Sequence, residues 1–192
     1  MNEEWHFSPE NAKMLRSTFI RLSDFMHEKG IEQIVGVGPS ATPYIRAIAR
    51  AHRNRRGVTL KLIALGELGE QVADVAHSGK VEKAASLLSA RKIQPKKTLL
   101  FDEVVHIGKQ ILGVKSVFDH LKIPHETATL ASSSDYSPLL SFVGRKDVTA
   151  DFQFYLGRGK LFKSKRNARS DGAYLARIRS ELREIADSLP RK

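Results

Sequence analysis

Short apolar segments rich in β-branched residues alternate with helical segments along most of the chain, and no other feature constrains the fold as strongly. Each apolar segment predicts a buried strand, and the strands are expected at 33–37, 58–65, 97–101, 126–131 and 151–156. Strands that alternate with helices form parallel sheets with right-handed crossovers. The sequence therefore predicts an α/β fold in which a parallel sheet of about five strands is flanked by helices.

Further helices are predicted at both ends of the chain. Residues 8–10 read Ser-Pro-Glu, a typical helix start, and apolar residues recur at helical spacing until Gly30 closes the helix. A last helix is expected at 172–189, with an apolar stripe that serves either packing or a homodimer contact. The stripe consists of Tyr174, Leu175, Ile178, Leu182 and Ile185. The predicted division is an N-terminal helix packed on the core, an α/β core, and a basic segment with the last helix: 1–30, 31–157 and 158–192.

The composition narrows the setting and the partners of the chain. There is no cysteine, which excludes disulfides and thiolate metal sites and fits a reducing cytoplasm. No apolar run is long enough to cross a bilayer, and the acidic, polar N-terminus does not resemble a secretory signal. We therefore expect a cytoplasmic protein without a membrane partner. The net charge of +11 predicts an anionic partner: nucleic acid, a polyphosphate metabolite or an acidic protein.

An adjacent acid pair follows the third predicted strand. In such sheets ligands bind beyond the carboxyl ends of the strands, which is where Asp102 and Glu103 are expected. Neighbouring carboxylates repel each other, so they need a cation or hydroxyl groups; a ribose diol would suit both, and Mg²⁺ could share them. Gly108 permits a tight turn, and the helix expected from Ile111 would aim its N–H groups at a phosphate, with Lys109 adding a cation. The alternative is a solvated acid pair before an ordinary strand-to-helix turn.

Two stretches of the chain resemble the type I phosphoribosyltransferases. The segment "TLLFDEVVHIGKQ" resembles their motif for phosphoribosyl pyrophosphate (PRPP), in which apolar residues, two acids and two further apolar residues lead into a phosphate loop. Its Gly-Lys pair is most similar to the hypoxanthine-guanine branch. The segment "IVGVGPSATPYIRAIA" is similar to the family's first strand and pyrophosphate loop, which precede a helix with Thr42 as a candidate cap and Pro43 in its first turn. The resemblance covers about residues 31–156 and implies this family's α/β fold.

The resemblance also implies roles for residues. Asp102 and Glu103 would hold the ribose diol and Mg²⁺, and the stretch 66–80, interpreted as a mobile loop, would close over the site with Lys80. Pyrophosphate and the 5′-phosphate would be bound by two loops. The pyrophosphate loop would be Gly38, Pro39, Ser40 and Ala41, and the phosphate loop His106, Ile107, Gly108, Lys109 and Gln110.

Several positions depart from the family's pattern. Ile107 and Gln110 replace the usual threonines of the phosphate loop, and residues 39–41 read Pro-Ser-Ala instead of Arg-Gly-Gly. His106 stands where the hypoxanthine branch places an aspartate; it is either a plain loop histidine, or a proton relay or contact to the base.

Two functions are consistent with these features. The first is an enzyme that transfers phosphoribosyl from PRPP to a nucleobase-type acceptor; the second is a weakly active or inactive module of the same fold that senses a nucleotide or binds nucleic acid. An unrelated doubly wound domain is a third, plainer interpretation.

A basic segment after the fifth predicted strand could track nucleic acid, cover an anionic substrate, or simply tether the last helix. It contains Arg158, Lys160, Lys163, Lys165, Arg166 and Arg169. Arg53, Arg55 and Arg56 are interpreted as a solvated helix end.

Overall fold

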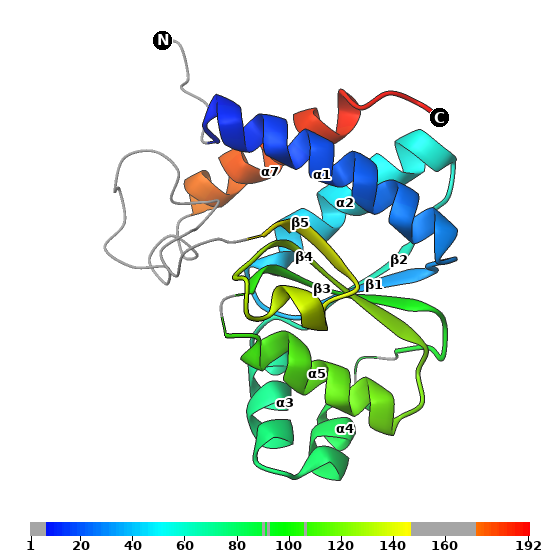
Figure 1. Cartoon of the computed structure of the whole chain (residues 1–192), viewed down its shortest axis with the longest axis vertical. Coiled ribbons are helices and arrows are strands. Elements are labelled where there is room, and N and C mark those ends of the chain that lie inside the picture. The colour runs from blue at the N-terminus through cyan, green and yellow to red at the C-terminus, as the bar shows by residue number, and fades with distance from the viewer. Residues whose placement is uncertain (1–6, 90, 92, 106, 147–171) are drawn as a thin grey trace.

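The computed structural model describes residues 7–89, 91, 93–105, 107–146 and 172–192. A five-stranded parallel sheet forms the middle layer, in the order β2-β1-β3-β4-β5 (Figure 1). The chain thus has the predicted α/β architecture. Its strands are β1 (Gln33–Gly36), β2 (Lys61–Ala64), β3 (Thr98–Val105), β4 (His125–Ser132) and β5 (Phe142–Arg145), with the 3₁₀ turn η1 (Ser137–Leu139) before the last.

Two helical layers enclose the sheet, one on each face (Figure 1). One layer holds α1 (Pro9–Glu28), α2 (Ala41–Arg56) and α7 (Gly172–Asp187), and the other holds α3 (Glu67–His77), α4 (Val81–Ser89) and α5 (Lys109–His120). Each layer buries its own apolar core against the sheet. The strand residues of β3 divide between them: Leu99 and Phe101 face the first core, and Leu100 faces the second.

The terminal helices form as the sequence predicts. The hydroxyl of Ser8 accepts a hydrogen bond from the Asn11 N–H at 3.1 Å, which satisfies one of the open donors at the start of α1. In α7, Ile178, Leu182 and Ile185 are 3%, 1% and 0% exposed and belong to the core shared with α1 and α2. This part of the stripe therefore serves packing within the chain; a homodimer contact stays a prediction.

The stretch 66–80 is not the predicted mobile loop, because most of it forms the helix α3. Val72, Ala73 and Ala76 lie on one face of this helix and are buried. A Cβ added to Gly113 of α5 would lie 2.8 Å from the Ala73 Cα, so the two helices pack closely. Glycines and an exposed polar face made the segment look like a loop, although its apolar residues have helical spacing.

Two further details differ from the sequence predictions. The fifth strand of the described sheet is β5, whereas the strand predicted at 151–156 and the basic segment at 158–169 lie outside the described residues. Gly144 weakens the strand signal of β5, but it allows close packing of the strand against Thr18. The N-cap position of α2 is Ser40 instead of Thr42, and its side chain makes no capping hydrogen bond.

The arginines at the end of α2 do not form a uniformly solvated helix end. Arg55 is 5% exposed, and its guanidinium donates a hydrogen bond to the Asp24 carboxylate at 3.1 Å. Arg56 contacts the same carboxylate, and only Arg53 is exposed. Burial alone would raise the pKa of Asp24, but the hydrogen bonds from the two arginines outweigh burial, so this pKa lies below its ordinary value.

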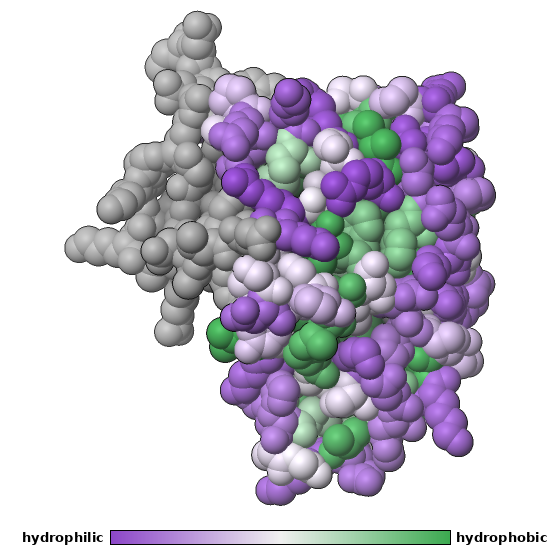
Figure 2. Space-filling view, in the orientation of Figure 1, coloured by the Kyte–Doolittle hydropathy of each residue, from purple (hydrophilic) through white to green (hydrophobic). Residues whose placement is uncertain are grey.

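The surface in the view of Figure 2 is mostly hydrophilic, and apolar residues emerge in small separate groups. Within the described ranges, no helix is both long and apolar enough for a membrane span.

Candidate functional site

The site lies at the point where the sheet changes direction. From β1 the chain passes to α2 on one face, and from β3, the neighbouring strand, it passes to α5 on the other. Such a switch point leaves a crevice beyond the carboxyl ends of the two strands. A Cβ added to Gly38 would lie 3.4 Å from Asp102 Oδ1 and 3.2 Å from Gln110 Oε1. The structure therefore brings together the two loops that the sequence singled out.

The acid pair lies inside β3, because the strand continues to Val105 instead of ending before Asp102 as predicted. Asp102 is 6% exposed and lines a cavity, and its Oδ1 accepts a hydrogen bond from the Glu103 N–H at 2.9 Å. Glu103 is 1% exposed and is not among the residues that line this cavity. Neighbouring residues of a strand point to opposite faces, so only the first acid of the pair faces the crevice.

The cavity beside Asp102 has a volume of about 430 Å³ and an acidic lining. Helix α3 contributes Glu70 and Asp74, which join the Asp102 carboxylate there. Lys109 Nζ lies 2.7 Å from Asp74 Oδ1, and Gln110 donates a hydrogen bond to Glu70 at 3.0 Å. With more carboxylates than cations, this lining favours hydroxyl donors and cations, and a phosphate needs a cation between it and the acids.

Sequence reasoning missed Glu70 and Asp74, because they fall in the segment interpreted as a loop. Their spacing of four residues, with Ala73 between them on the buried face, is the signal that could have placed them on one side of a helix.

The turn before α5 has the predicted conformation but a crowded surface. Gly108 has φ +67°, and α5 begins at Lys109, two residues earlier than expected. A Cβ on Gly108 would lie 2.8 Å from the Tyr136 ring, so this aromatic side chain packs against the turn. Ile107 is 69% exposed, and His106 lies outside the described residues. The carbonyl of Lys109 is 2.7 Å from His77 Nε2, a contact between α3 and the start of α5.

The loop between β1 and α2, predicted to bind pyrophosphate, is compact. The Ala41 N–H donates to the Gly38 carbonyl at 3.1 Å, and Pro39 and Ser40 are half-buried between them. Lys80, the predicted closing residue, is exposed in the turn between α3 and α4 and is not among the residues that line the Asp102 cavity. Its role stays a prediction.

The donor set of the cavity suits a metal that arrives with a ligand. Within the described ranges no three Asp, Glu, His or Cys side chains are arranged to hold a metal by themselves. Mg²⁺ in phosphate-binding sites commonly takes one or two protein carboxylates and completes its shell with phosphate oxygens and water. Asp102, together with Glu70 or Asp74, offers oxygen donors of this kind.

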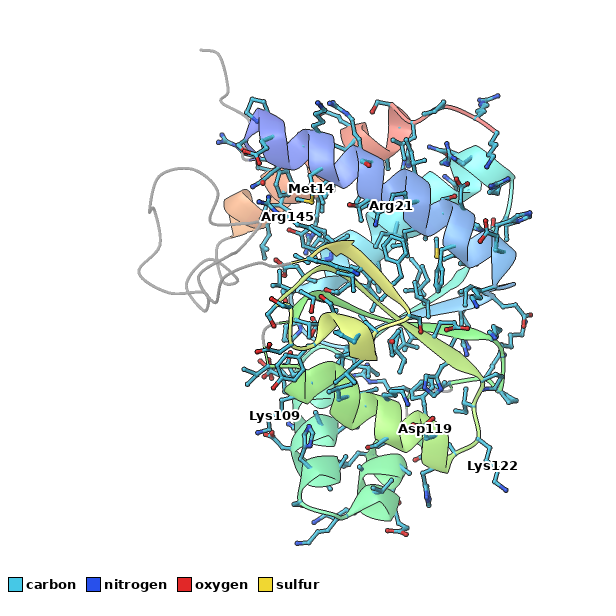
Figure 3. All side chains as sticks on the ribbon, in the orientation of Figure 1. Met14, Arg21, Lys109, Asp119, Lys122 and Arg145 are labelled. Atoms are coloured by element: carbon cyan, nitrogen blue, oxygen red, sulfur yellow. The ribbon has the colours of Figure 1, made fainter. Side chains whose placement is uncertain are left out.

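Figure 3 shows where this end of the molecule lies. Lys109 marks the start of α5, whereas Asp119 and Lys122 lie at its far end. Arg145, at the end of β5, lies on the same side of the molecule as Lys109. The crevice is therefore at the carboxyl edge of the sheet, and Asp119 offers an exposed carboxylate remote from it.

Comparison with known proteins identifies the fold. No family model matches the chain, and no curated protein matches it. A hypoxanthine phosphoribosyltransferase from Staphylococcus aureus is similar in structure, with a TM-score of 0.51 and 11% identity over 84% of this chain and 88% of that one. A hypoxanthine-guanine phosphoribosyltransferase from Schistosoma mansoni in complex with IMP has a TM-score of 0.44 and 16% identity, over 71% and 61%. A phosphoheptose isomerase from Francisella tularensis has a TM-score of 0.39 and 12% identity, over 93% and 86%. The similarity to the Staphylococcus aureus enzyme shows that this chain has a phosphoribosyltransferase-like fold.

Proposed function

We propose that this chain binds PRPP or a nucleotide, as its Mg²⁺ complex, in the crevice between β1 and β3, and transfers phosphoribosyl to a nucleobase-type acceptor. One observation carries the proposal: Asp102 Oδ1 lies 3.4 Å from the position of a Cβ on Gly38, so a carboxylate and a glycine backbone share one crevice. A ribose ring beside the carboxylate would have its phosphates within reach of the Gly38 loop and the start of α5. The fold supports this reading by analogy.

The residues have distinct tasks in this proposal. Asp102 accepts a hydrogen bond from a ribose hydroxyl and, with Glu70 and Asp74, provides the negative field in which positive charge can develop on the sugar. Mg²⁺, when bound with the ligand, would neutralise phosphate charge next to these acids. Lys109 and the N–H groups that open α5 face the 5′-phosphate, and the close-packed Gly38 backbone faces the pyrophosphate. Fixed orientation and electrostatics suffice for this reaction without a covalent intermediate.

A second candidate, a binding module with little turnover, is favoured by two specific observations. Glu103 does not line the cavity, so one member of the acid pair is not positioned at the sugar. Tyr136 packs against Gly108, which narrows the turn expected to hold the phosphate. Such a protein would bind a nucleotide without transferring phosphoribosyl.

Calorimetry with PRPP and with nucleoside monophosphates, each with and without Mg²⁺, tests both candidates. We expect Mg²⁺-dependent binding that weakens at least tenfold, or about 1.4 kcal/mol, in Asp102→Asn. Asp119→Asn, which removes an exposed carboxylate at the far end of α5, serves as the matched control and leaves affinity unchanged. Release of pyrophosphate with a panel of bases supports the transferase; binding without release supports the binding module. Absence of binding to every phosphoribosyl ligand refutes the proposal.

A further inference from the structure

A second concave surface lies on the opposite helical layer, between α2 and α7. It has a volume of about 330 Å³, and all the charged residues in its described lining are arginines. Three come from α2 at positions i, i+4 and i+7, and two come from α7 at i and i+4, so each set lies along one side of its helix. These residues, Arg46, Arg50, Arg53, Arg179 and Arg183, are called the arginine groove.

One carboxylate serves this groove, and it is already engaged. Asp187 accepts a hydrogen bond from Arg50 Nη2 at 2.8 Å and another from Asn54 at 3.0 Å. The hydrogen bond with Arg50 lowers the pKa of Asp187, and the nearby charge of Arg183 lowers it further. The guanidinium groups of Arg46, Arg53 and Arg179 form no ion pair with any described carboxylate. The groove therefore holds a clear excess of positive charge over acid.

Apart from Arg50, the arginines of the groove have no evident role in stability. Arg46, Arg53, Arg179 and Arg183 are exposed, and gathering like charges on two adjacent helices is unfavourable in the absence of a counter-ion. Exposed cations bind a single small anion weakly because water screens them. A polyanion differs, since each neutralised phosphate releases condensed counter-ions and adds to the affinity. A row of exposed arginines thus suits a charged polymer better than a small metabolite.

We propose that the arginine groove binds the phosphodiester backbone of a nucleic acid. Guanidinium groups match phosphate oxygens in a bidentate geometry, which favours arginine at such surfaces. No aromatic side chain is among the described residues that line the groove, so these residues offer bases no stacking platform. Recognition is therefore of the backbone, independent of sequence and strongly dependent on salt. The groove does not share lining residues with the Asp102 cavity, so this inference does not depend on the proposed function.

The test is fluorescence anisotropy with a labelled oligouridylate of about 20 nucleotides, longer than a typical single-stranded site, across about 50–200 mM salt. The variant is Arg46→Gln/Arg53→Gln/Arg179→Gln. The control is Lys83→Gln/Arg91→Gln/Lys122→Asn, which removes the same charge from exposed positions on or beside the other helical layer; asparagine suits the positive φ of Lys122. Segment 158–169 is unchanged in both.

We expect the groove variant to bind at least tenfold more weakly, and its slope of log affinity against log salt to be smaller in magnitude by about 2, because up to three phosphate contacts are lost. The control should keep most of the wild-type slope. Equal losses in both variants would show an effect of net charge alone and overturn the proposal. Competition by inorganic triphosphate as effective as that by RNA at equal phosphate would overturn it in favour of a small-anion site. Arg→Lys at the same three positions keeps the positive charge but removes the bidentate guanidinium geometry. This variant should keep the wild-type salt slope and bind RNA more weakly.

Discussion

The two concave surfaces of this molecule have opposite character. The cavity beside Asp102 is lined by three carboxylates and one lysine, whereas the groove between α2 and α7 is lined by arginines whose one acid is already paired. The lining of the acidic cavity comes from the end of β3, the turn after it, and the helices α3 and α5, whereas the arginines of the groove come from the sides of α2 and α7. Net charge alone would have predicted a phosphate site anywhere on this chain. The described residues instead place an acidic cavity at the carboxyl edge of the sheet and an arginine-lined groove on one helical layer.

The largest expected effect concerns the helix that makes the cavity acidic. A side chain at Gly69 of α3 would run into the Val37 carbonyl, a backbone atom that cannot move aside. We expect Gly69→Ala to lower the free energy of unfolding by more than about 3 kcal/mol, measured by urea denaturation. Gly57→Ala is the control: it also adds one methyl, but no atom lies within 4 Å, so only its φ of +71° opposes the change, at about 1 kcal/mol. Equal effects would show that α3 is not packed tightly against the Val37 backbone, directly after β1.

The next prediction separates structural from binding arginines within α2. Arg55 is buried and bonded to Asp24 and to the Pro190 carbonyl, so Arg55→Gln should cost about 2–3 kcal/mol of unfolding free energy. Arg53→Gln, two residues earlier and exposed, should change stability by less than about 0.5 kcal/mol but weaken RNA binding. Denaturation and anisotropy on the same pair of variants measure both effects. The distinction fails if Arg53→Gln destabilises the fold as much as Arg55→Gln does.

A smaller effect, in which a substitution strengthens ligand binding, is expected in the cavity beside Asp102. Asp74 holds the Lys109 ammonium at 2.7 Å, and both side chains are largely exposed. Asp74→Asn removes a competing anion, so metal-free phosphate or nucleotide should bind a few-fold more tightly, in line with an exposed ion pair worth about 0.2–1 kcal/mol. Lys109→Gln should weaken the same binding. Calorimetry without Mg²⁺ measures both; weaker phosphate binding in Asp74→Asn would contradict the assigned role of Lys109.

The smallest effect is a pH dependence on the groove side of the molecule. His52 is 1% exposed, and its Nδ1 lies 3.1 Å from the Ser23 hydroxyl. Burial lowers the pKa of His52 below its ordinary value of 6.5, although a hydrogen bond with the Ser23 backbone opposes this shift. Neutral His52 therefore favours the folded state. Its contribution to the free energy of unfolding is complete above pH 6.5 and is lost as the pH falls through the lower pKa of the folded state. The free energy of unfolding should therefore decline from pH 6.5 downward, and His52→Gln should remove that part of the slope. His120→Gln, on the exposed end of α5, should retain it.

Much of the fold could be predicted because its signals are local. β1 and the first half of β3 are short apolar runs, β4 has alternating threonines and apolar residues, and α1 has both a capping serine and a helical apolar pattern. The boundary of β3 was misplaced since Asp102 and Glu103 interrupt its apolar run, yet Val104 and Val105 continue the strand. A hydrophobic pattern alone cannot reveal that a strand continues through two buried carboxylates.

The candidate site was predicted in part for a similar reason. Gly38 and Asp102 come from motifs at strand ends, and the topology of the sheet brings such ends together. Glu70 and Asp74 belong to α3, where Gly69 lowers helix propensity but permits close contact with Val37. The packing of Tyr136 on Gly108 depends on the connection after β4, which has no periodic signal. Tertiary contacts of this kind decide the shape of the crevice.

The position of a bound metal–ligand complex would show whether the crevice between β1 and β3 is the binding site. Mn²⁺ can replace Mg²⁺ and broadens the NMR signals of nearby amides, so a titration with PRPP and trace Mn²⁺ reports the position of the complex in the intact chain. We expect the amides of Gly38, Glu70 and Asp102 to lose intensity only when PRPP is present, and the amides of Arg50 and Arg183 in the arginine groove to keep theirs. Broadening centred on the groove, or none at the β1–β3 crevice, would rule out the proposed PRPP site.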